Sequence, residues 1–240
     1  MTELLYLENP ALSRASARVM RSRPDGIVLD RTVFYPRGGG QPGDSGRLRW
    51  ECGEVPIVEA VKGEAGSVIH LPAPALPLPE EGSEVEAEID RPRRMRLMRM
   101  HTALHLLCSL LPGAAVTGGQ VGTERSRLDF DLPNPPAREA LEEALNALVA
   151  ADHPVQAEWV DEAVLDANPD LVRTLSVKPP RGAGRIRLIR IGADPKPIDL
   201  QPCGGTHVAH TGEIGPVRIL KIESKGRQNR RIVLALAEET

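Results

Sequence analysis

The first ninety residues alternate short apolar segments with glycine and proline and show no helical period. Segments of this kind cover residues 26–29, 55–61, 68–71 and 85–89. Short apolar runs bounded by turn residues are typical of antiparallel strands, and their spacing favours a small β-barrel. Residues 71–79 carry prolines at 72, 74, 77 and 79, which exclude a central strand and predict an extended surface loop.

The pattern changes at Asp90, where apolar residues begin to recur at helical spacing. Asp90 can cap a helix and Pro92 suits its first turn, and Pro112 followed by Gly113 would end it. The positions on this helix are Met95, Met98, Leu104, His105, Leu107, Cys108 and Leu111. We therefore expect two domains, 1–89 and 90–240, joined by a linker at residues 88–92.

The second domain mixes helices and strands. A second helix is predicted to begin at Asn134 and to run to Val149, with an apolar stripe at Leu141, Leu145 and Leu148. Strand-like segments follow at residues 155–160, 185–191, 217–222 and 232–236, with a short helix at 161–167. This mixture predicts an α+β fold behind the N-terminal barrel.

Composition excludes several classes of protein. The chain has 240 residues, a formal net charge of −3 and 41% hydrophobic residues, which is ordinary for a globular protein. Only two Phe, two Tyr and two Trp are present, so recognition of bases by many stacked rings is disfavoured. No apolar run approaches the ~20 residues of a membrane helix, and Glu3 and Glu8 lie where a signal peptide would be apolar. We therefore expect a cytoplasmic protein without a membrane partner.

Two pairs of potential metal ligands stand about 100 residues apart in the sequence. His101 and His105 are four residues apart on the predicted helix, so both imidazoles lie on one helix face. Cys203 and His207 flank a tight turn that contains two glycines. Two histidines on a helix are more often solvated or packed in a core than bound to metal, but the second pair reverses that expectation. Three imidazoles and one thiolate suit zinc better than magnesium or calcium.

The remaining histidines and cysteines have no such partners. Three cysteines make an odd count, which argues against a disulfide framework. We interpret His70, His153, His210 and Cys52 as structural or surface residues, and Cys108 as a packed thiol on the buried side of the first helix.

Several motifs together carry a resemblance to a known family. They are HTALHLL at 101–107, CGGTHV at 203–208 and TGEIG at 211–215, supported by residues 119–130 and 225–232. In these motifs the chain resembles the editing domain of alanyl-tRNA synthetase, which is related to that of threonyl-tRNA synthetase. Residues 34–46 (FYPRGGGQPGDSG) resemble the glycine-rich segment of the longer free-standing editing proteins of the AlaX type. About 90 residues precede the histidine helix, too few for an aminoacylation domain.

The resemblance implies a trans-editing hydrolase that removes serine or glycine from mischarged alanine tRNA. A synthetase pocket shaped for a methyl group cannot strongly reject a side chain with an added hydroxyl, so a second site must do so. The resemblance also implies a small N-terminal β-barrel followed by an α+β editing domain whose zinc is held by His101, His105, Cys203 and His207. The partner would be tRNA(Ala), and the sequence leaves open whether the protein is a monomer or a homodimer.

Candidate catalytic groups lie beside the metal motifs. Gln120 and Thr123 have polar side chains suited to hydrogen-bonding a serine hydroxyl, and the backbone amides of Gly204 and Gly205 could stabilise an oxyanion. Ordinary turn chemistry is the alternative for all four residues. Four protein ligands would fill a tetrahedral zinc, so the sequence leaves open whether zinc activates a water or only organises the pocket.

Basic residues gather in two clusters that suggest RNA contact. The clusters are Arg91, Arg93, Arg94, Arg96 and Arg99, and Lys221, Lys225, Arg227, Arg230 and Arg231. Since arginine matches phosphate with a bidentate fork, we assign tRNA contacts to Arg93, Arg96, Lys225, Arg227 and Arg230. Gly39 and Gly40 would let the loop backbone approach RNA closely. A solvated charged face and a hairpin that itself requires glycine are the alternatives.

Two other functions compete with the editing hypothesis. One is a zinc hydrolase that acts on a small ester or amide, for which the arginines would have no role. The other is a non-catalytic tRNA-binding module with a structural zinc. Incubation with Ser-tRNA(Ala) and Ala-tRNA(Ala), with and without chelator, separates the three.

Overall fold

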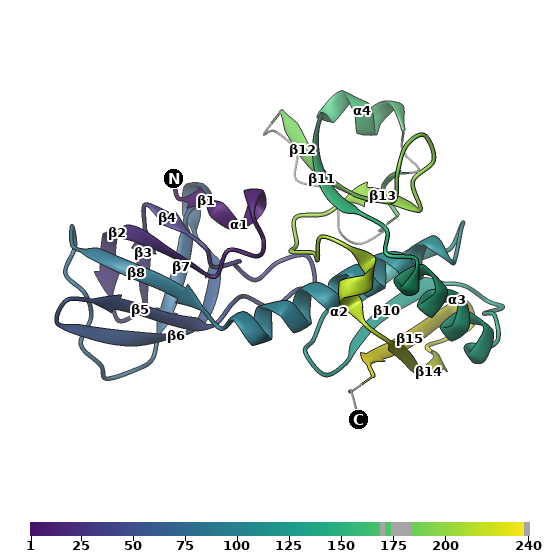
Figure 1. Cartoon of the computed structure of the whole chain (residues 1–240), viewed down its shortest axis with the longest axis horizontal. Helices are drawn as coiled ribbons and strands as arrows, with labels where there is room; N and C mark the ends of the chain where they lie inside the picture. The colour runs from purple at the N-terminus through teal and green to yellow at the C-terminus, as the bar shows by residue number, and fades with distance from the viewer. Residues whose placement is uncertain (169–170, 174–183, 238–240) are drawn as a thin grey trace. The chain divides into compact units, whose positions relative to one another are not determined.

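The computed structural model describes residues 1–168, 171–173 and 184–237 (Figure 1). Contacts divide the chain into two compact units, Met1–Arg96 and Leu97–Thr240. The division lies inside a helix, several residues after the boundary expected at 89/90, because the arginines of the first helical turn contact the first unit.

The first unit is a closed six-stranded barrel, which confirms the expected fold of this half. Its strands, in their order around the barrel, are β2 (Arg14–Arg23), β3 (Gly26–Leu29), β7 (Val68–Pro72), β6 (Gly53–Lys62), β5 (Gly46–Trp50) and β8 (Glu84–Ile89). Every neighbouring pair is antiparallel. Inward residues such as Leu29, Leu48 and Ile57 form its apolar core. Short elements accompany the barrel: β1 (Glu3–Leu4), α1 (Leu5–Glu8), β4 (Arg31–Thr32) and a 3₁₀ turn at Glu64–Gly66.

Helix α2 (Arg91–Ser109) begins in the first unit and continues into the second. Asp90 caps it, since its carboxylate accepts the backbone N–H of Arg93 at 3.0 Å. The C-terminal half of α2 is almost fully buried, including Leu106 and Leu107. It therefore supplies a rigid support for the side chains at 101 and 105.

Two antiparallel sheets make up the rest of the second unit, which is α+β as expected. One sheet has the order β14 (Val217–Ser224), β15 (Asn229–Leu236), β10 (Ser126–Asp131) and β9 (Ala115–Gln120). The other has the order β11 (Val155–Asp161), β12 (Arg185–Ile191) and β13 (Asp199–Pro202). Helix α3 (Arg138–Ala150) contacts β14, where Asn146 bonds both the N–H and the C=O of Val217. Helix α4 (Glu162–Ala167) follows β11, and a 3₁₀ turn covers Thr211–Ile214.

Several elements differ from the sequence prediction. Helix α3 begins at Arg138 rather than at Asn134, because the backbone is still extended at Ala137 (ψ 138°) after the two prolines. Strands β2, β5, β9, β10 and β13 were not anticipated. Within the described part of the chain, no helix combines the length and the apolar character needed to cross a membrane.

Candidate functional site

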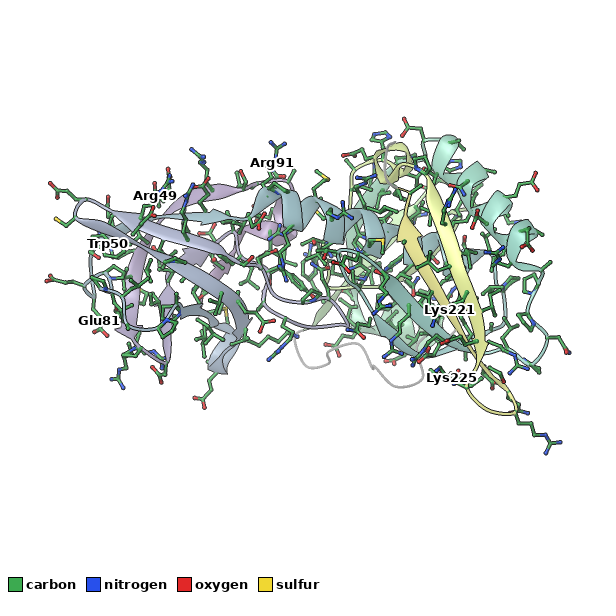
Figure 2. The ribbon with its side chains drawn as sticks, turned by 90° about the horizontal axis from the view of Figure 1, so that it is seen from below. Arg49, Trp50, Glu81, Arg91, Lys221 and Lys225 are labelled. Carbon is green, nitrogen blue, oxygen red and sulfur yellow. The ribbon has the colours of Figure 1, made fainter. Side chains whose placement is uncertain are left out.

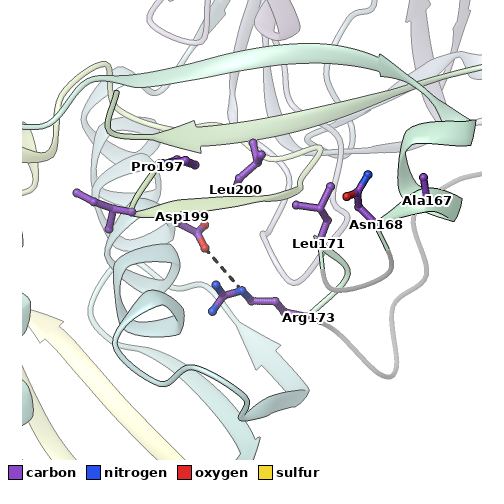
Figure 3. Close-up of a pocket in the computed structure, with 8 residues that line it drawn as sticks. Ala167, Asn168, Leu171, Arg173, Pro197, Asp199 and Leu200 are labelled. Atoms are coloured by element: carbon purple, nitrogen blue, oxygen red, sulfur yellow. Dashed lines mark ion pairs between the residues drawn. The ribbon is translucent and has the colours of Figure 1, made fainter. Parts of the chain in front are cut away.

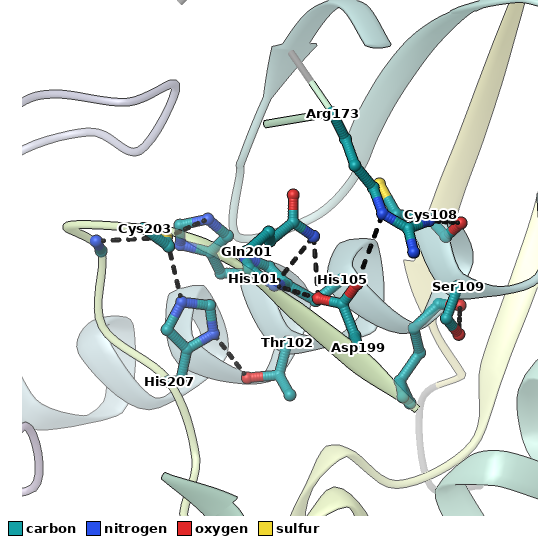
Figure 4. A network of polar contacts seen from close by, with 12 residues as sticks. His101, Thr102, His105, Cys108, Ser109, Arg173, Asp199, Gln201, Cys203 and His207 are labelled. Carbon is teal, nitrogen blue, oxygen red and sulfur yellow. Dashed lines mark hydrogen bonds and ion pairs between the residues drawn. The ribbon is translucent and has the colours of Figure 1, made fainter. Parts of the chain in front are cut away.

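The structure brings together the four side chains that the sequence singled out as metal ligands. His101 and His105 come from one face of α2, and Cys203 and His207 come from the segment that follows β13 (Figure 4). Their donor atoms all lie within 4.8 Å of one another. The Cys203 Sγ atom is 3.3 Å from Nε2 of His207 and 3.6 Å from Nε2 of His101. This cluster could hold a metal ion.

Two of the imidazoles are fixed in a definite tautomer. The carboxylate of Asp199 can only accept, so Nδ1–H of His105 donates to its Oδ2 at 2.8 Å. The Thr102 hydroxyl donates to the Met98 carbonyl at 2.9 Å and therefore accepts from Nδ1–H of His207 at 3.1 Å. When these two rings are neutral, Nε2 is therefore their unprotonated atom and faces the centre of the cluster, which is the form that binds metals.

Electrostatics favour a thiolate at Cys203. Burial by itself raises the pKa of this thiol, but the nearby charges of His101 and His207 hold it well below its usual range. The backbone N–H of Gly205 also donates to the sulfur at 3.4 Å. Burial opposes protonation of His105, yet hydrogen bonds to Asp199 and Cys203 raise its pKa to about 10. A cation is therefore favoured among these donors, whether a proton or a metal ion.

Three polar residues around the cluster were missed by the sequence analysis. Arg187, on β12 and 6% exposed, donates from Nη1 to the carbonyls of Cys203 and Gly205, both at 2.9 Å. Asp199 and Gln201 are also buried on β13, and the Gln201 amide donates to Asp199 at 2.8 Å. Residues 199, 201 and 203 alternate along the chain, so a strand ending in a ligand could have suggested inward-facing polar groups before it.

The two glycines of the turn differ in their surroundings. A Cβ atom at Gly204 would meet no atom of the described residues within 4 Å, and the residue has no positive φ. Gly205 is buried beside the sulfur. Turn geometry therefore gives no reason for glycine at 204, where the surface beside Cys203 is open.

Gln120 and Thr123 lie outside the metal-binding cluster. Gln120 is exposed at the end of β9, and its Oε1 accepts from Nε of Arg127 at 3.4 Å. Thr123 is half-buried between β9 and β10. Their suggested contact with a serine hydroxyl stays a prediction.

The glycine-rich loop forms a tight hairpin. Gly38 and Gln41 exchange both backbone hydrogen bonds at 3.0 Å, and Gly39 and Gly40 between them have φ angles of 57° and 82°. Two central residues with positive φ define the hairpin turn that favours glycine, so the turn alone accounts for both glycines. Their contact with RNA stays a prediction.

Most of the arginines before the metal-binding histidines contact the protein itself. Arg93 donates to the Gly43 carbonyl at 2.9 Å, and Arg99 donates to the Ile214 carbonyl at 2.7 Å. Arg94 is 2% exposed and forms a buried ion pair with Asp44. Arg96 is half-buried and also interacts with other residues of the protein, whereas Arg91 is exposed. Phosphate binding by Arg93 would compete with its contact to the loop.

The C-terminal cations are also largely paired. Lys221 and Lys225, labelled near β14 in Figure 2, both contact Glu223, at 2.7 Å and 3.4 Å. Arg230 donates to the Pro133 carbonyl at 2.7 Å. Arg227 is exposed between β14 and β15, and among the described residues its side chain has no hydrogen-bond or ion-pair partner. It is the basic residue of this cluster best placed to meet an external phosphate.

The other histidines and cysteines behave as expected. Cys108 is 5% exposed, and burial raises the pKa of its thiol to about 12, so it is a packed thiol. Cys52 and His210 are exposed and His153 is half-buried. His70 is fully buried in the barrel, where it bonds Thr32 at 2.8 Å and the Ile27 carbonyl at 3.0 Å.

Comparison with known protein families matches both units. The model described as "Threonyl and Alanyl tRNA synthetase second additional domain" matches residues 186–233, which contain the turn of Cys203 and His207. The model described as "tRNA synthetases class II (A)" matches residues 8–93, which contain the barrel. The fold and the cluster therefore define a protein built from tRNA-synthetase domains.

Comparison with individual proteins narrows this class to one family. The chain is 36% identical to the alanyl-tRNA editing protein AlaX-M of Methanosarcina acetivorans, over 99% of this chain and 100% of that protein. It is 34% identical to AlaX-M of Saccharolobus solfataricus, over 97% and 98% of the two chains. It is 38% identical to the alanine–tRNA ligase of Pyrobaculum neutrophilum, over 92% of this chain but 25% of the ligase. The chain belongs to the family of free-standing alanyl-tRNA editing proteins.

Proposed function

We propose that this protein hydrolyses the ester bond of alanine tRNA that carries serine or glycine, at a zinc ion held by His101, His105, Cys203 and His207. The carrying observation is the convergence of these four side chains in a chain that matches alanyl-tRNA editing proteins along almost its whole length. Family membership makes it an aminoacyl-tRNA hydrolase that acts on tRNA(Ala). The zinc ion and the identity of the misplaced amino acid are the proposed parts.

The donor set supports zinc. Imidazoles and thiolates are its common ligands, and no carboxylate belongs to the described cluster. A nitrogen and a sulfur bound to one tetrahedral zinc would lie about 3.5 Å apart, from Zn–N and Zn–S distances of roughly 2.0 and 2.3 Å. The separations of Sγ from the imidazole nitrogens, 3.3 Å and 3.6 Å, agree with that value.

The protein groups around the ion would position the ester. Cys203 is half-buried and Gly204 exposed, whereas the three histidines are at most 7% exposed, so substrate would approach beside the turn. Gly204 leaves room there for the acyl group and for a hydrogen bond from its backbone N–H to the developing oxyanion. Arg187 holds the turn in place through two carbonyls. When bound, zinc supplies Lewis acidity at this point.

Selection of the amino acid and contact with tRNA would fall to residues outside the cluster. We assign recognition of the serine hydroxyl to Gln120 and Thr123, since a site that hydrogen-bonds a hydroxyl penalises the alanyl ester that lacks it. We assign phosphate contacts to Arg93, Arg96, Lys225, Arg227 and Arg230, and a backbone contact to Gly39 and Gly40.

The test is hydrolysis of Ser-tRNA(Ala), Gly-tRNA(Ala) and Ala-tRNA(Ala) by protein with measured metal content. We expect about one zinc per chain, fast loss of serine and slow loss of alanine, with activity removed by a chelator and restored by zinc. His105→Ala should lose the metal, and its rate of hydrolysis should fall at least about 100-fold. The substitution removes a ligand together with that ligand's hydrogen bond to the Asp199 carboxylate.

Matched controls are available among the other histidines and cysteines. His153→Ala and Cys52→Ser should keep zinc and activity, since neither residue belongs to the cluster. If the metal-loaded protein hydrolyses neither Ser-tRNA(Ala) nor Gly-tRNA(Ala), the proposal is wrong. Hydrolysis of a small ester together with inactivity on tRNA would favour a small-molecule hydrolase, and tight tRNA binding without hydrolysis would favour a binding module.

A further inference from the structure

A buried carboxylate lies directly behind the metal-binding cluster. Asp199 is 1% exposed, and its Oδ2 accepts hydrogen bonds from Nδ1–H of His105 and from the Gln201 amide, both at 2.8 Å (Figure 4). His105 has a charged acceptor behind it, while His207 has the neutral hydroxyl of Thr102. The two sides of the cluster are therefore supported differently.

The negative charge of Asp199 is balanced from the opposite side. Among the described residues its Oδ1 has no hydrogen-bond partner, and it is 3.9 Å from Nε of Arg173. Both residues line a cavity of about 360 Å³ (Figure 3). Arg173 is held by its own bond from Nη1 to the Cys108 carbonyl, at 2.8 Å. Arg173 therefore places a positive charge beside the carboxylate, on the side away from His105.

An ionised carboxylate bonded to Nδ1–H of an imidazole has two effects on a metal ligand. It fixes the ring so that Nε2 faces the ion, and it makes that nitrogen a stronger donor. A neutral acceptor orients the ring in the same way but strengthens Nε2 as a donor less.

We propose that Asp199 is the positioning residue of the metal centre and sets the tautomer and donor strength of His105. The guanidinium of Arg173 balances the negative charge of Asp199. This inference rests on the proposed metal centre but not on the proposed substrate. The competing role is purely structural: Asp199 would tie β13 to α2 and would leave metal affinity unchanged.

Two substitutions separate orientation from charge. Asp199→Ala removes the acceptor and the charge, and should weaken binding of zinc or cobalt(II) by about 10- to 100-fold. Asp199→Asn keeps the shape and an acceptor oxygen but loses the charge, so its loss should be smaller. Both should change the visible absorption of the cobalt(II) protein, because its bands report the ligand field at the ion.

The matched control is Asp44→Asn, which alters an equally buried carboxylate in the barrel unit. Metal affinity is measured by competition with a chromophoric chelator at constant pH, and thermal unfolding of the metal-free protein is recorded for every variant. We expect Asp44→Asn to lower thermal stability without changing affinity or spectrum.

The outcomes are distinct. If the soluble Asp199→Asn variant and any folded Asp199→Ala variant match the wild type in affinity and spectrum, the positioning role is overturned and only a structural role is left. A wild-type protein that takes up no metal overturns both this inference and the proposed function. A wild-type protein that binds metal but does not deacylate tRNA overturns only the proposed function.

Discussion

Each unit of the molecule contains a buried polar cluster, and the two clusters are built on opposite principles. In the barrel unit, donors of Arg94 meet acceptors: the Asp44 carboxylate and the carbonyls of Pro10 and Val33. In the second unit, Nε2 of His207 and of His101 turn toward the sulfur of Cys203, so that groups able to give a lone pair to a metal face one another. A cluster whose donors face acceptors is complete with protein groups alone, whereas a cluster of facing lone pairs gains stability from a proton or a metal ion.

The largest expected effect tests whether the barrel cluster is purely structural. Arg94→Leu leaves the Asp44 charge buried without its partner and should cost about 3–5 kcal/mol of unfolding free energy. Urea unfolding followed by Trp50 fluorescence, in a Trp159→Phe background, measures it. Metal content should stay at the wild-type value.

The double variant Arg94→Leu/Asp44→Leu is the control for this substitution. Since it removes both charges, it should recover most of the stability. If Arg94→Leu alone lowers metal content and leaves the barrel stable, the barrel cluster is not purely structural and the comparison between the two clusters is wrong.

The second prediction concerns pH and His70. Burial lowers the pKa of His70 to about 4, although its bond to the Ile27 carbonyl acts in the opposite direction. The unfolded chain binds this proton near pH 6.5 and the barrel does not, so the stabilisation is present above pH 6.5 and is lost as the pH falls toward 4. Between pH 7.5 and pH 5 the loss should be about 2 kcal/mol.

Urea unfolding at the two pH values, with Trp50 as the probe, gives this difference. His70→Gln, which is neutral at both pH values, should reduce the pH dependence by about the same amount. An identical pH dependence in the variant would show that other groups cause the acid sensitivity.

The third prediction sharpens the comparison on the side of the metal-binding cluster. Gly204→Ala places a methyl group in open space, so stability should change by less than about 0.5 kcal/mol. If substrate approaches beside the turn, kcat/KM for Ser-tRNA(Ala) should fall about 10-fold. Steady-state kinetics measures kcat/KM and urea unfolding measures stability. Gly118→Ala on β9 is the control, because the residue lies outside the turn. Unchanged kinetics would place the acyl group elsewhere.

The smallest effect is expected for the tRNA contacts. Arg227→Ser should weaken tRNA binding a few-fold and lower the slope of log K against log salt by about 1, because one phosphate contact is lost. The neutral neighbour Gln228→Ser should leave the slope unchanged. Binding titrations at several salt concentrations decide the point, and an unaltered slope in the arginine variant would exclude Arg227 from the interface.

The sequence predicts the metal-binding helix well because its rules are local. Asp90 caps α2, as its side chain and the N–H of Arg93 show, and a four-residue spacing places His101 and His105 on one face. The pairing of this face with Cys203 and His207, about 100 residues away, came from motif chemistry and the family resemblance rather than from periodicity.

The missed elements lack a strong apolar signal. Inward positions of β2 are small, such as Ala15 and Ala17, and β13 directs the polar Asp199 and Gln201 into the interior. The roles of Asp199 and Arg187 depend on partners 94 and 16 residues away. A local sequence pattern does not include partners so far apart, so these supporting polar contacts could be identified only from the structure.

Because the contact boundary falls between Arg96 and Leu97, inside α2, the choice of a cut site matters for any shortened form of the protein. A fragment that starts at Leu97 would lose the Asp90 cap and leave His101 in a fraying helix end, where backbone N–H groups lack partners. Starting at Asp90 instead retains the cap and keeps His101 about three turns inside the helix. The smallest unit suitable for transplantation into another protein therefore begins seven residues earlier than the contacts suggest.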